Sequence, residues 1–179
     1  RYLPHYMSWK SKILTRVFIS RTDAQVCITN GAREALLGLG WTRPERVAVV
    51  YNSVDVKRFS SLNKKKEARA RLGLPADALL LGMVCRLFWA KGCVDLLALL
   101  KRLPDNWHGV FCGAGPQLLE LKNFCEEQNL SHRVHFLGRQ DDVTTVYESL
   151  DAYAFLSRYE PFGLVMAEAM ASGIPVFGL

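Results

Sequence analysis

The sequence predicts an α/β fold with a Rossmann-like, doubly wound parallel sheet that carries helices on both faces. Continuous apolar runs bounded by turns, as in strands buried on both faces, alternate with helical segments from residue 79 onward. Strands separated by helices favour parallel pairing, because a parallel crossover needs a covering helix. Half of the 179 residues are hydrophobic, enough for one sizeable core and part of another.

The charge of the chain limits the classes of partner. Its net charge is +6 and its pI is about 9.2. This balance suits sugar nucleotides or phospholipid head groups, and no basic cluster is strong enough for us to expect nucleic acid. No apolar run approaches the roughly 20 residues that span a bilayer, and no secretory signal opens the chain. We therefore expect a cytoplasmic protein, with peripheral contact at a membrane as an open alternative.

The cysteines and histidines indicate neither disulfides nor a metal site. The five cysteines are odd in number, lie in apolar surroundings and lack paired metal spacing, which is typical of reduced core residues. His132 and His135 lie an odd number of positions apart at a strand, so we expect them on opposite faces, unable to share a metal. The start at Arg1 without methionine and the end at Leu179 inside an apolar run predict a fragment.

A mixed aromatic and basic segment, residues 1–20, opens the chain. Four of its apolar residues are spaced for one helix face: Ile13, Leu14, Val17 and Phe18. The basic side carries Lys10, Lys12, Arg16 and Arg21. Such a helix is either a solvated surface helix or one that faces a membrane or a substrate. A strand at 24–29, a helix capped by Asn30 and a strand at 46–51 are expected next.

Five strands and their intervening helices are predicted in the remainder. After three lysines at 64–66, a helix ends at a glycine and a proline before residue 76. The strands are expected at 79–85, 109–113, 133–138, 152–156 and from 174. The helices between them are expected to include one with Val94, Leu97 and Leu100 on its apolar face, then 117–128 and 141–150. A last helix is expected to stop at Gly173.

Polar residues follow four of these strands. The loops begin at Arg86, Gly113, Gly138 and Ser157. In a parallel sheet all such loops open on one edge, where ligands bind, so we expect them to converge. Arg86 and Lys91 supply fixed positive charge suited to a diphosphate.

The loop after the fourth strand turns into a helix between two carboxylates. Glu160 lies in the turn and Glu168 in the helix, whose first N–H groups would welcome an anion. This stretch, EPFGLVMAEAMASGIPV, resembles the signature of two glutamates separated by seven residues in retaining GT-B glycosyltransferases of the family-4 type, the glycosyl transferases group 1.

Two further motifs resemble the same family. Arg86 and Lys91, each with the residue after it, match its Gly-Arg-Leu and Lys-Gly motif, except that Cys85 replaces the glycine and would crowd the backbone. Residues 52–55 resemble the crossover between its two domains, with Ser53 in place of a glycine. The resemblance implies the tail of an N-terminal acceptor domain and the crossover in residues 1–56. Residues 57–179 would then form a nucleotide-sugar-binding domain, incomplete at its C-terminus.

The resemblance also implies an activity. It is the transfer of a hexosyl group from a nucleotide-diphosphate sugar to a glycan, lipid or small-molecule acceptor, with retention of anomeric configuration and without a metal or other cofactor. The sugar, the base and the acceptor stay open. The alternatives are another GT-B enzyme, such as a sugar-nucleotide epimerase, and a non-catalytic nucleotide-binding module.

Roles follow for individual residues by the same resemblance. Arg86 and Lys91 would hold the diphosphate, Glu160 would bind hydroxyls of the transferred sugar, and Glu168 would bind the ribose. These first three are the expected catalytic residues. The full expected donor-binding set is Arg86, Lys91, Gly113, Gly138, Arg139, Glu160, Phe162, Gly163, Leu164 and Glu168.

Overall fold

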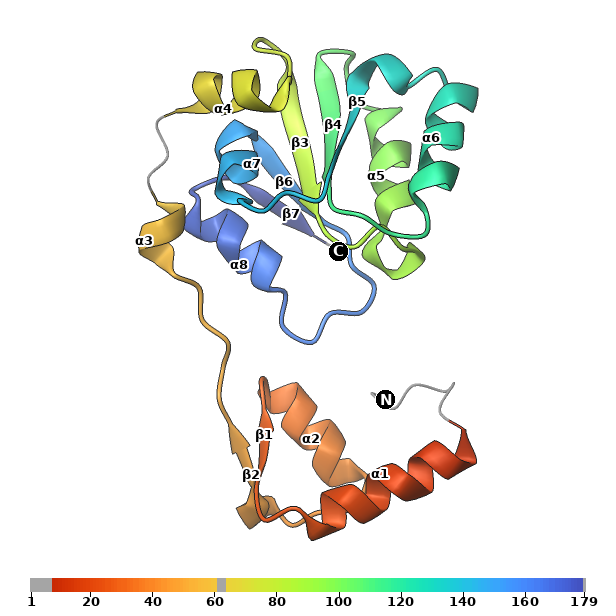
Figure 1. Cartoon of the computed structure of the whole chain (residues 1–179), viewed down its shortest axis with the longest axis vertical. Helices are drawn as coiled ribbons and strands as arrows, with labels where there is room; N and C mark the ends of the chain where they lie inside the picture. The colour runs from red at the N-terminus through yellow and green to blue at the C-terminus, as the bar shows by residue number, and fades with distance from the viewer. Residues whose placement is uncertain (1–7, 61–63, 179) are drawn as a thin grey trace. The chain divides into compact units, whose positions relative to one another are not determined.

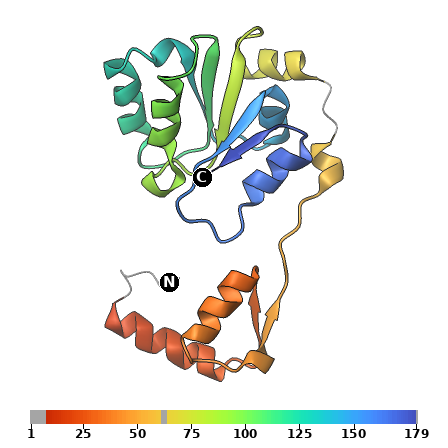
Figure 2. The ribbon, with the colours of Figure 1, turned by 180° about the vertical axis from the view of Figure 1, so that it is seen from behind.

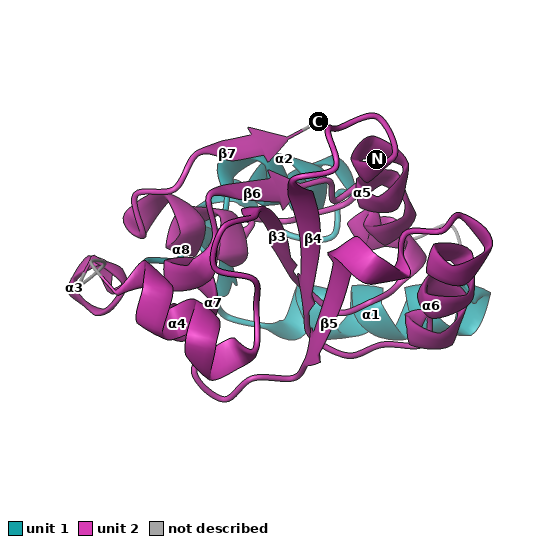
Figure 3. Cartoon of the chain, turned by 90° about the horizontal axis from the view of Figure 1, so that it is seen from above, with its two compact units in different colours: residues 1–53 teal, residues 54–179 magenta. Residues whose placement is uncertain are grey.

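The chain divides into two compact units, residues 1–53 and 54–179 (Figure 3). The computed structural model describes residues 8–60 and 64–178. The division falls at Ser53, inside the segment that resembles a domain crossover, whereas the sequence placed the boundary after Val56.

The smaller unit contains two short parallel strands and their helices. Its elements are α1 (Trp9–Arg21), β1 (Gln25–Cys27), α2 (Asn30–Gly38), the 3₁₀ turn η1 (Pro44–Arg46) and β2 (Val47–Val49). Every residue of α1 is at least partly exposed. The cap of α2 is Thr29 and not Asn30, because the extended backbone of Thr29 lets its hydroxyl accept a 3.0 Å hydrogen bond from the Ala32 N–H.

The larger unit is a five-stranded parallel sheet wrapped by helices (Figure 1). Its strands are β3 (Leu79–Val84), β4 (Trp107–Cys112), β5 (Val134–Gly138), β6 (Ala152–Phe155) and β7 (Val176–Gly178). Its helices are α3 (Val56–Phe59), α4 (Lys65–Leu72), α5 (Cys93–Leu100), α6 (Leu118–Glu127), α7 (Thr144–Ser149) and α8 (Leu164–Ala171), with 3₁₀ turns η2 (Trp89–Lys91) and η3 (Ser131–Arg133). The predicted α/β class with a parallel sheet is therefore observed.

Helices cover both faces of this sheet (Figure 1 and Figure 2). Helices α5 and α6 lie on one face, over a core that includes Leu97 and Phe111. Helices α4, α7 and α8 lie on the other, over a core that includes Tyr147 and Ala169. Neighbouring residues of β3 alternate between the two cores, as the pleat of a strand requires.

The sheet order places a switch point beside β3. The strands lie in the order β5-β4-β3-β6-β7, so the chain moves outward from β3 through β4 to β5 and then returns to the other side of β3. Adjacent loops therefore diverge between β3 and β6, and open α/β sheets bind ligands at that place. The loops concerned carry Lys91 and Glu160.

Two further expected details of the helices are wrong. Val94 is 37% exposed, because the buried stripe of α5 is formed by Cys93, Leu96, Leu97 and Leu100. Helix α7 begins at Thr144 and not at residue 141. The Asp142 carboxylate accepts hydrogen bonds from the Thr144 N–H and hydroxyl, which ends the loop before the helix.

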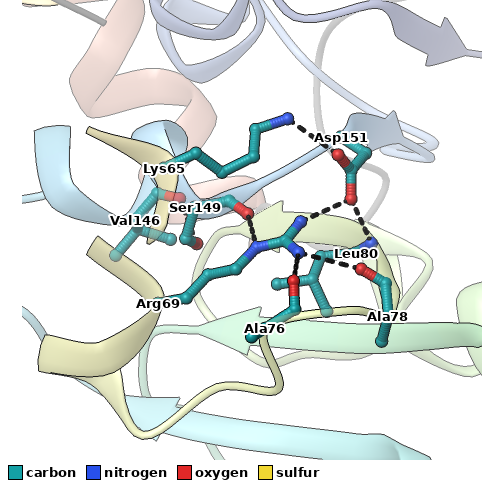
Figure 4. Close-up of polar contacts among 8 residues, drawn as sticks. All are labelled: Lys65, Arg69, Ala76, Ala78, Leu80, Val146, Ser149 and Asp151. Carbon is teal, nitrogen blue, oxygen red and sulfur yellow. Dashed lines mark hydrogen bonds and ion pairs between the residues drawn. The ribbon is translucent and has the colours of Figure 1, made fainter. Parts of the chain in front are cut away.

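A buried arginine ties α4 to the sheet (Figure 4). The Arg69 guanidinium makes a 2.6 Å ion pair with Asp151, which also accepts hydrogen bonds from Lys65 and from the Leu80 N–H, each at 2.7 Å. The Arg69 guanidinium also donates hydrogen bonds to the carbonyls of Ser149, Ala76 and Ala78. Burial alone would raise the pKa of Asp151, but these donors and the charge of Arg69 lower it.

No helix in residues 8–60 and 64–178 is both long and apolar enough to cross a membrane.

Candidate functional site

The loops at the carboxyl edge of the sheet are joined by backbone hydrogen bonds. The Leu87 N–H donates to the Ala114 carbonyl at 3.0 Å, and the Gln117 N–H donates back to the Leu87 carbonyl at 3.1 Å. The Gly113 N–H donates to the Gly138 carbonyl at 2.7 Å, which joins the next loop to the group. Three of the four predicted loops therefore form one connected structure.

Glycines allow these loops to approach so closely. Gly113 has a φ of +135°, and a Cβ there would overlap the Cys85 carbonyl oxygen. A Cβ at Gly115 would overlap the Leu87 carbonyl in the same way. The glycine-rich turn after β4 is therefore packed against the backbone on either side of Arg86, which only glycine permits.

The fourth loop, between β6 and α8, is held against η2. The Arg158 N–H donates to the Ala90 carbonyl at 2.8 Å, and its guanidinium bonds both oxygens of Asp95 at 2.9 and 3.2 Å. Gly92, with a φ of +73°, abuts the Leu156 carbonyl where a Cβ would overlap it. These contacts connect the loops on either side of the switch point.

An ion pair between Lys91 and Glu160 spans this point. The Lys91 Nζ lies 2.5 Å from the Glu160 Oε2, with 19% and 21% of the two side chains exposed. The two residues are predicted site residues from different loops, and the fold brings them into direct contact. Arg86 is also on this edge, exposed, with its guanidinium carbon 6.0 Å from the centre of the Phe88 ring.

The N-terminus of α8 opens at the same loop. Gly163 has a φ of +86° and no side-chain cap bonds the helix at this position. The first N–H groups of the helix, beginning at Leu164, are therefore disposed to bind an anion. Phe162 beside them is half-buried, and Gly163 is packed so that a Cβ would lie 2.9 Å from the Phe155 ring.

The Glu168 carboxylate accepts a hydrogen bond from Tyr147, a residue that the sequence did not indicate. The Tyr147 hydroxyl donates to the Glu168 Oε2 at 2.8 Å, with the Val165 carbonyl 3.2 Å from the same hydroxyl. Burial, with the neighbouring Tyr153 and Glu168 acting in the same direction, raises the pKa of Tyr147. No spacing in the sequence indicates this contact, since it joins a residue in α7 to one in α8.

Gly138 and Arg139 form the outermost part of the edge. Gly138 has a φ of +65°, and Arg139 is exposed. The structure therefore places Gly138 at the end of β5 and Arg139 directly after it, joined to the neighbouring loop through the bond between Gly138 and Gly113.

The cysteine that replaces a glycine turns its side chain away from the loop. The Cys85 Sγ lies 3.9 Å from the Cys93 Sγ. This hydrogen bond, followed by burial, raises the pKa of Cys85, while the same bond is the main cause that lowers the pKa of Cys93. Either thiol can donate in this contact, which packs the Cys85 side chain against the start of α5.

The histidines lie near the amino ends of their strands, away from the candidate site. His135 of β5 lies beside His108 of β4, with the Nδ1 of His108 3.0 Å from the Nε2 of His135 and the rings stacked. Burial is the main cause that lowers the pKa of each imidazole. His132 is exposed.

The arrangement can bind an anion and several hydroxyl groups together. Two cations and a helix N-terminus lie on one edge, with a carboxylate in the same loop and a second in the following helix. Cations and helix termini stabilise phosphate-like groups, whereas carboxylates accept hydrogen bonds from hydroxyls.

Comparison with known proteins gives one family. Residues 64–178 match the family described as Glycosyl transferases group 1. The lipopolysaccharide core biosynthesis mannosyltransferase LpsB of Rhizobium meliloti is 34% identical over 171 residues, covering 90% of this chain and 46% of LpsB. The core biosynthesis glycosyltransferase LpsE of the same organism is 32% identical over 159 residues, covering 89% of this chain and 44% of LpsE. The chain thus spans less than half the length of these curated relatives.

Solved structures show the same fold. HepE of Anabaena, in complex with UDP and glucose, superposes with a TM-score of 0.88 at 26% identity, covering 98% of this chain and 50% of HepE. Its complex with UDP-glucose gives the same TM-score at 27% identity. WaaG, a glycosyltransferase of lipopolysaccharide biosynthesis, has a TM-score of 0.81 at 21% identity, which supports the fold alone. The predicted fold class is confirmed.

Proposed function

This chain belongs to the Glycosyl transferases group 1 family, and from that membership we propose that it forms the donor site of a hexosyltransferase. The proposed reaction moves a hexosyl group from a nucleotide-diphosphate sugar to a glycan or lipid-linked acceptor with retention of anomeric configuration. The ion pair of Lys91 and Glu160 at the switch point of the sheet carries this proposal. It puts a phosphate-binding cation and a hydroxyl-binding carboxylate side by side, as a phosphate-linked sugar requires.

The cations serve the leaving group. When the anomeric bond breaks, negative charge develops on the β-phosphate, and preorganised positive groups lower the barrier most effectively. Arg86 and Lys91 supply full charges, and the N–H groups at the start of α8, from Leu164 onward, supply the positive end of a helix dipole. This set would serve in place of a metal ion.

The carboxylates serve the two sugars of the donor. Glu160 accepts hydrogen bonds from hydroxyls of the transferred hexose and holds its reacting face toward the acceptor. Glu168, in α8, accepts hydrogen bonds from the ribose hydroxyls. Gly138 and Arg139 line the position of the base, chiefly through backbone atoms.

Retention is proposed to proceed by attack on the face that the leaving group occupies. In this scheme the departing phosphate oxygen takes the proton of the acceptor hydroxyl, while the new glycosidic bond forms at the anomeric carbon and the old one breaks. No covalent intermediate on the chain is part of the proposal.

The relatives support the substrate classes. HepE binds UDP-glucose, and LpsB and LpsE act in lipopolysaccharide core biosynthesis, so we propose a UDP-hexose donor and a glycan or glycolipid acceptor. Such an acceptor would place a cytoplasmic enzyme at a membrane surface. Sedimentation with anionic and neutral phospholipid vesicles tests that location, and equal absence from both pellets would contradict it.

Calorimetry with UDP, GDP, ADP and UDP-glucose tests the donor site. We expect UDP binding that survives EDTA, disappears in Arg86→Ala and persists in Arg102→Ala, an exposed arginine at the other edge of the sheet. A ligand that binds only the folded chain also raises its melting temperature, which provides a second readout. UDP binding unchanged in Arg86→Ala would contradict the diphosphate assignment. UDP binding without turnover or transfer in the presence of UDP-glucose and glycan acceptors would favour a non-catalytic module.

A further inference from the structure

Tyr147 has one polar atom, and the fold directs it at Glu168. Its ring is fully buried in the core under α8, edge-on to Phe59 and tilted against Tyr153. The hydroxyl lies 2.8 Å from the Glu168 Oε2. A buried hydroxyl needs a partner, and among the groups near it the carboxylate accepts the stronger hydrogen bond.

The contact restrains one oxygen of Glu168 and leaves the other available. Glu168 is half-buried on α8, with its backbone fixed by the helix. A glutamate has three rotatable side-chain bonds, so an unsupported carboxylate would occupy several orientations and lose them on binding a ligand. The bond from Tyr147 fixes the orientation beforehand. Because burial keeps the phenol protonated, it remains a donor across the physiological pH range.

We propose that Tyr147 is a positioning residue that orients Glu168 to bind the ribose hydroxyls of the donor, and so makes the site selective for ribonucleotides over deoxyribonucleotides. The inference rests on the proposed donor site. A carboxylate with one oxygen fixed by the hydrogen bond from Tyr147 presents its other oxygen to a neighbouring pair of hydroxyls. A sugar that lacks the 2′-hydroxyl leaves part of that oriented carboxylate without a partner, which reduces affinity.

Replacing Tyr147 by phenylalanine removes the anchor and keeps the ring. Immobilising one rotamer-rich side chain costs about 0.5–1.5 kcal/mol on binding, which corresponds to about a two- to tenfold weaker affinity for UDP. The affinity for 2′-deoxy-UDP should change less, because fewer of its bonds depend on Glu168. The ratio of the two dissociation constants is therefore the quantity to measure.

Tyr153 provides the matched control. It is also buried, and its hydroxyl lies 3.2 Å from both the N–H and the carbonyl oxygen of Val84, without touching Glu168. Tyr153→Phe loses a buried hydroxyl of the same kind. We expect it to change UDP and 2′-deoxy-UDP affinity by equal factors, so that their ratio stays at the value of the unmodified chain.

A double-mutant cycle completes the test. Tyr147→Phe should have no further effect on UDP affinity in a Glu168→Ala background, since there is then no carboxylate to orient. Glu168→Asp, which keeps the charge but withdraws the carboxylate from Tyr147, should lower the ribose preference to a similar extent and serves if Tyr147→Phe does not fold. Melting temperatures check the folding of each variant.

The outcomes separate the two proposals. An equal loss for UDP and 2′-deoxy-UDP in Tyr147→Phe, or an effect that persists without the Glu168 carboxylate, would overturn the positioning role alone. An unmodified chain that binds UDP with no preference over 2′-deoxy-UDP would do the same. If the unmodified chain bound no nucleotide of the panel, the donor site itself would be refuted, and this inference with it.

Discussion

Neutralising Glu160 should affect the nucleotide and the nucleotide sugar in opposite directions. The Glu160 carboxylate pairs with Lys91 at 2.5 Å. A diphosphate that binds Lys91 must share this ammonium with the carboxylate, and the two negative groups repel one another. Glu160→Gln keeps the shape of the side chain and removes the competing charge. UDP alone should therefore bind more tightly, whereas UDP-glucose loses the charged acceptor of its sugar hydroxyls.

The magnitude follows from the exposure of the pair. Two unit charges about 4 Å apart interact by about 4 kcal/mol at an effective dielectric constant of about 20. Water reaches about a fifth of each side chain, and sharing Lys91 offsets part of the repulsion, so we expect about 1 kcal/mol, or about fivefold tighter UDP binding. A hydrogen bond to a charged group contributes about 1.5–3 kcal/mol, of which a glutamine retains a neutral part. The net result for UDP-glucose should be about twofold weaker binding, so the two affinities separate by about tenfold.

Titration calorimetry of UDP and UDP-glucose measures both effects on the same preparation. Glu126→Gln makes the same change of charge on the exposed side of α6 and should leave both affinities unaltered. The gain for UDP should shrink at high salt, because screening weakens the repulsion that the substitution removes. A loss of UDP affinity in Glu160→Gln as large as the loss of UDP-glucose affinity would refute the assignment of Glu160 to the sugar and of Lys91 to the phosphate.

Three further expectations concern stability and the helix terminus. Arg69→Gln breaks a buried ion pair and should lower the free energy of unfolding by about 3 kcal/mol. Arg58→Gln breaks an exposed 3.6 Å pair and should lower it by less than about 1 kcal/mol. Urea unfolding compares the two variants, and equal losses would contradict the difference in burial. Burial lowers the pKa of His108 and His135, so as the pH falls the unfolded chain binds protons at these histidines before the folded chain does. The free energy of unfolding should therefore decrease as the pH drops below about 6.5. Urea unfolding at pH 7.5 and 5.5 should show a smaller loss in His135→Gln, and an unchanged loss would exclude the pair as its source. Gly163→Ala forces an alanine into the left-handed region and should lower the free energy of unfolding by about 1–2 kcal/mol. It should also weaken UDP binding in calorimetry, and a variant with normal UDP affinity would exclude the start of α8 from the anion site.

The positions of the strands could be predicted because each is a continuous apolar run that ends in a turn. The first residues of the helices are harder to predict, because nearby side chains compete for hydrogen bonds with the backbone N–H groups there. Asp142 holds the loop before α7 with its own hydrogen bonds, and Thr29 takes the capping position that Asn30 was expected to fill. The exposed Val94 shows that an apolar residue at helical spacing does not by itself identify the buried stripe.

The meeting of the predicted loops could be derived from the sequence, because the topology of a parallel sheet brings them to one edge whatever their separation along the chain. Side-chain partners were not accessible in this way. Lys91 and Glu160 are both charged residues in loops, and nothing in either segment indicates that they bond to one another. Tyr147 reads as an ordinary core aromatic, since its ring is indeed buried and only the direction of its hydroxyl relates it to Glu168. Such pairs depend on side-chain orientation across elements, which periodicity does not encode.

The ion pair keeps two charged groups of the proposed donor site in place. An unpaired cation or carboxylate at a partly buried position is costly, and each would turn toward water if the other were missing. Lys91 and Glu160 neutralise one another while keeping both groups at the switch point, with the loops fixed around them by Gly92 and by the bond from Arg158 to Ala90. A phosphate alone competes with Glu160 for Lys91, whereas a phosphate joined to a hexose supplies a partner for each group. The complete donor should therefore be recognised by the simultaneous separation of this pair, which neither free sugar nor free phosphate can accomplish.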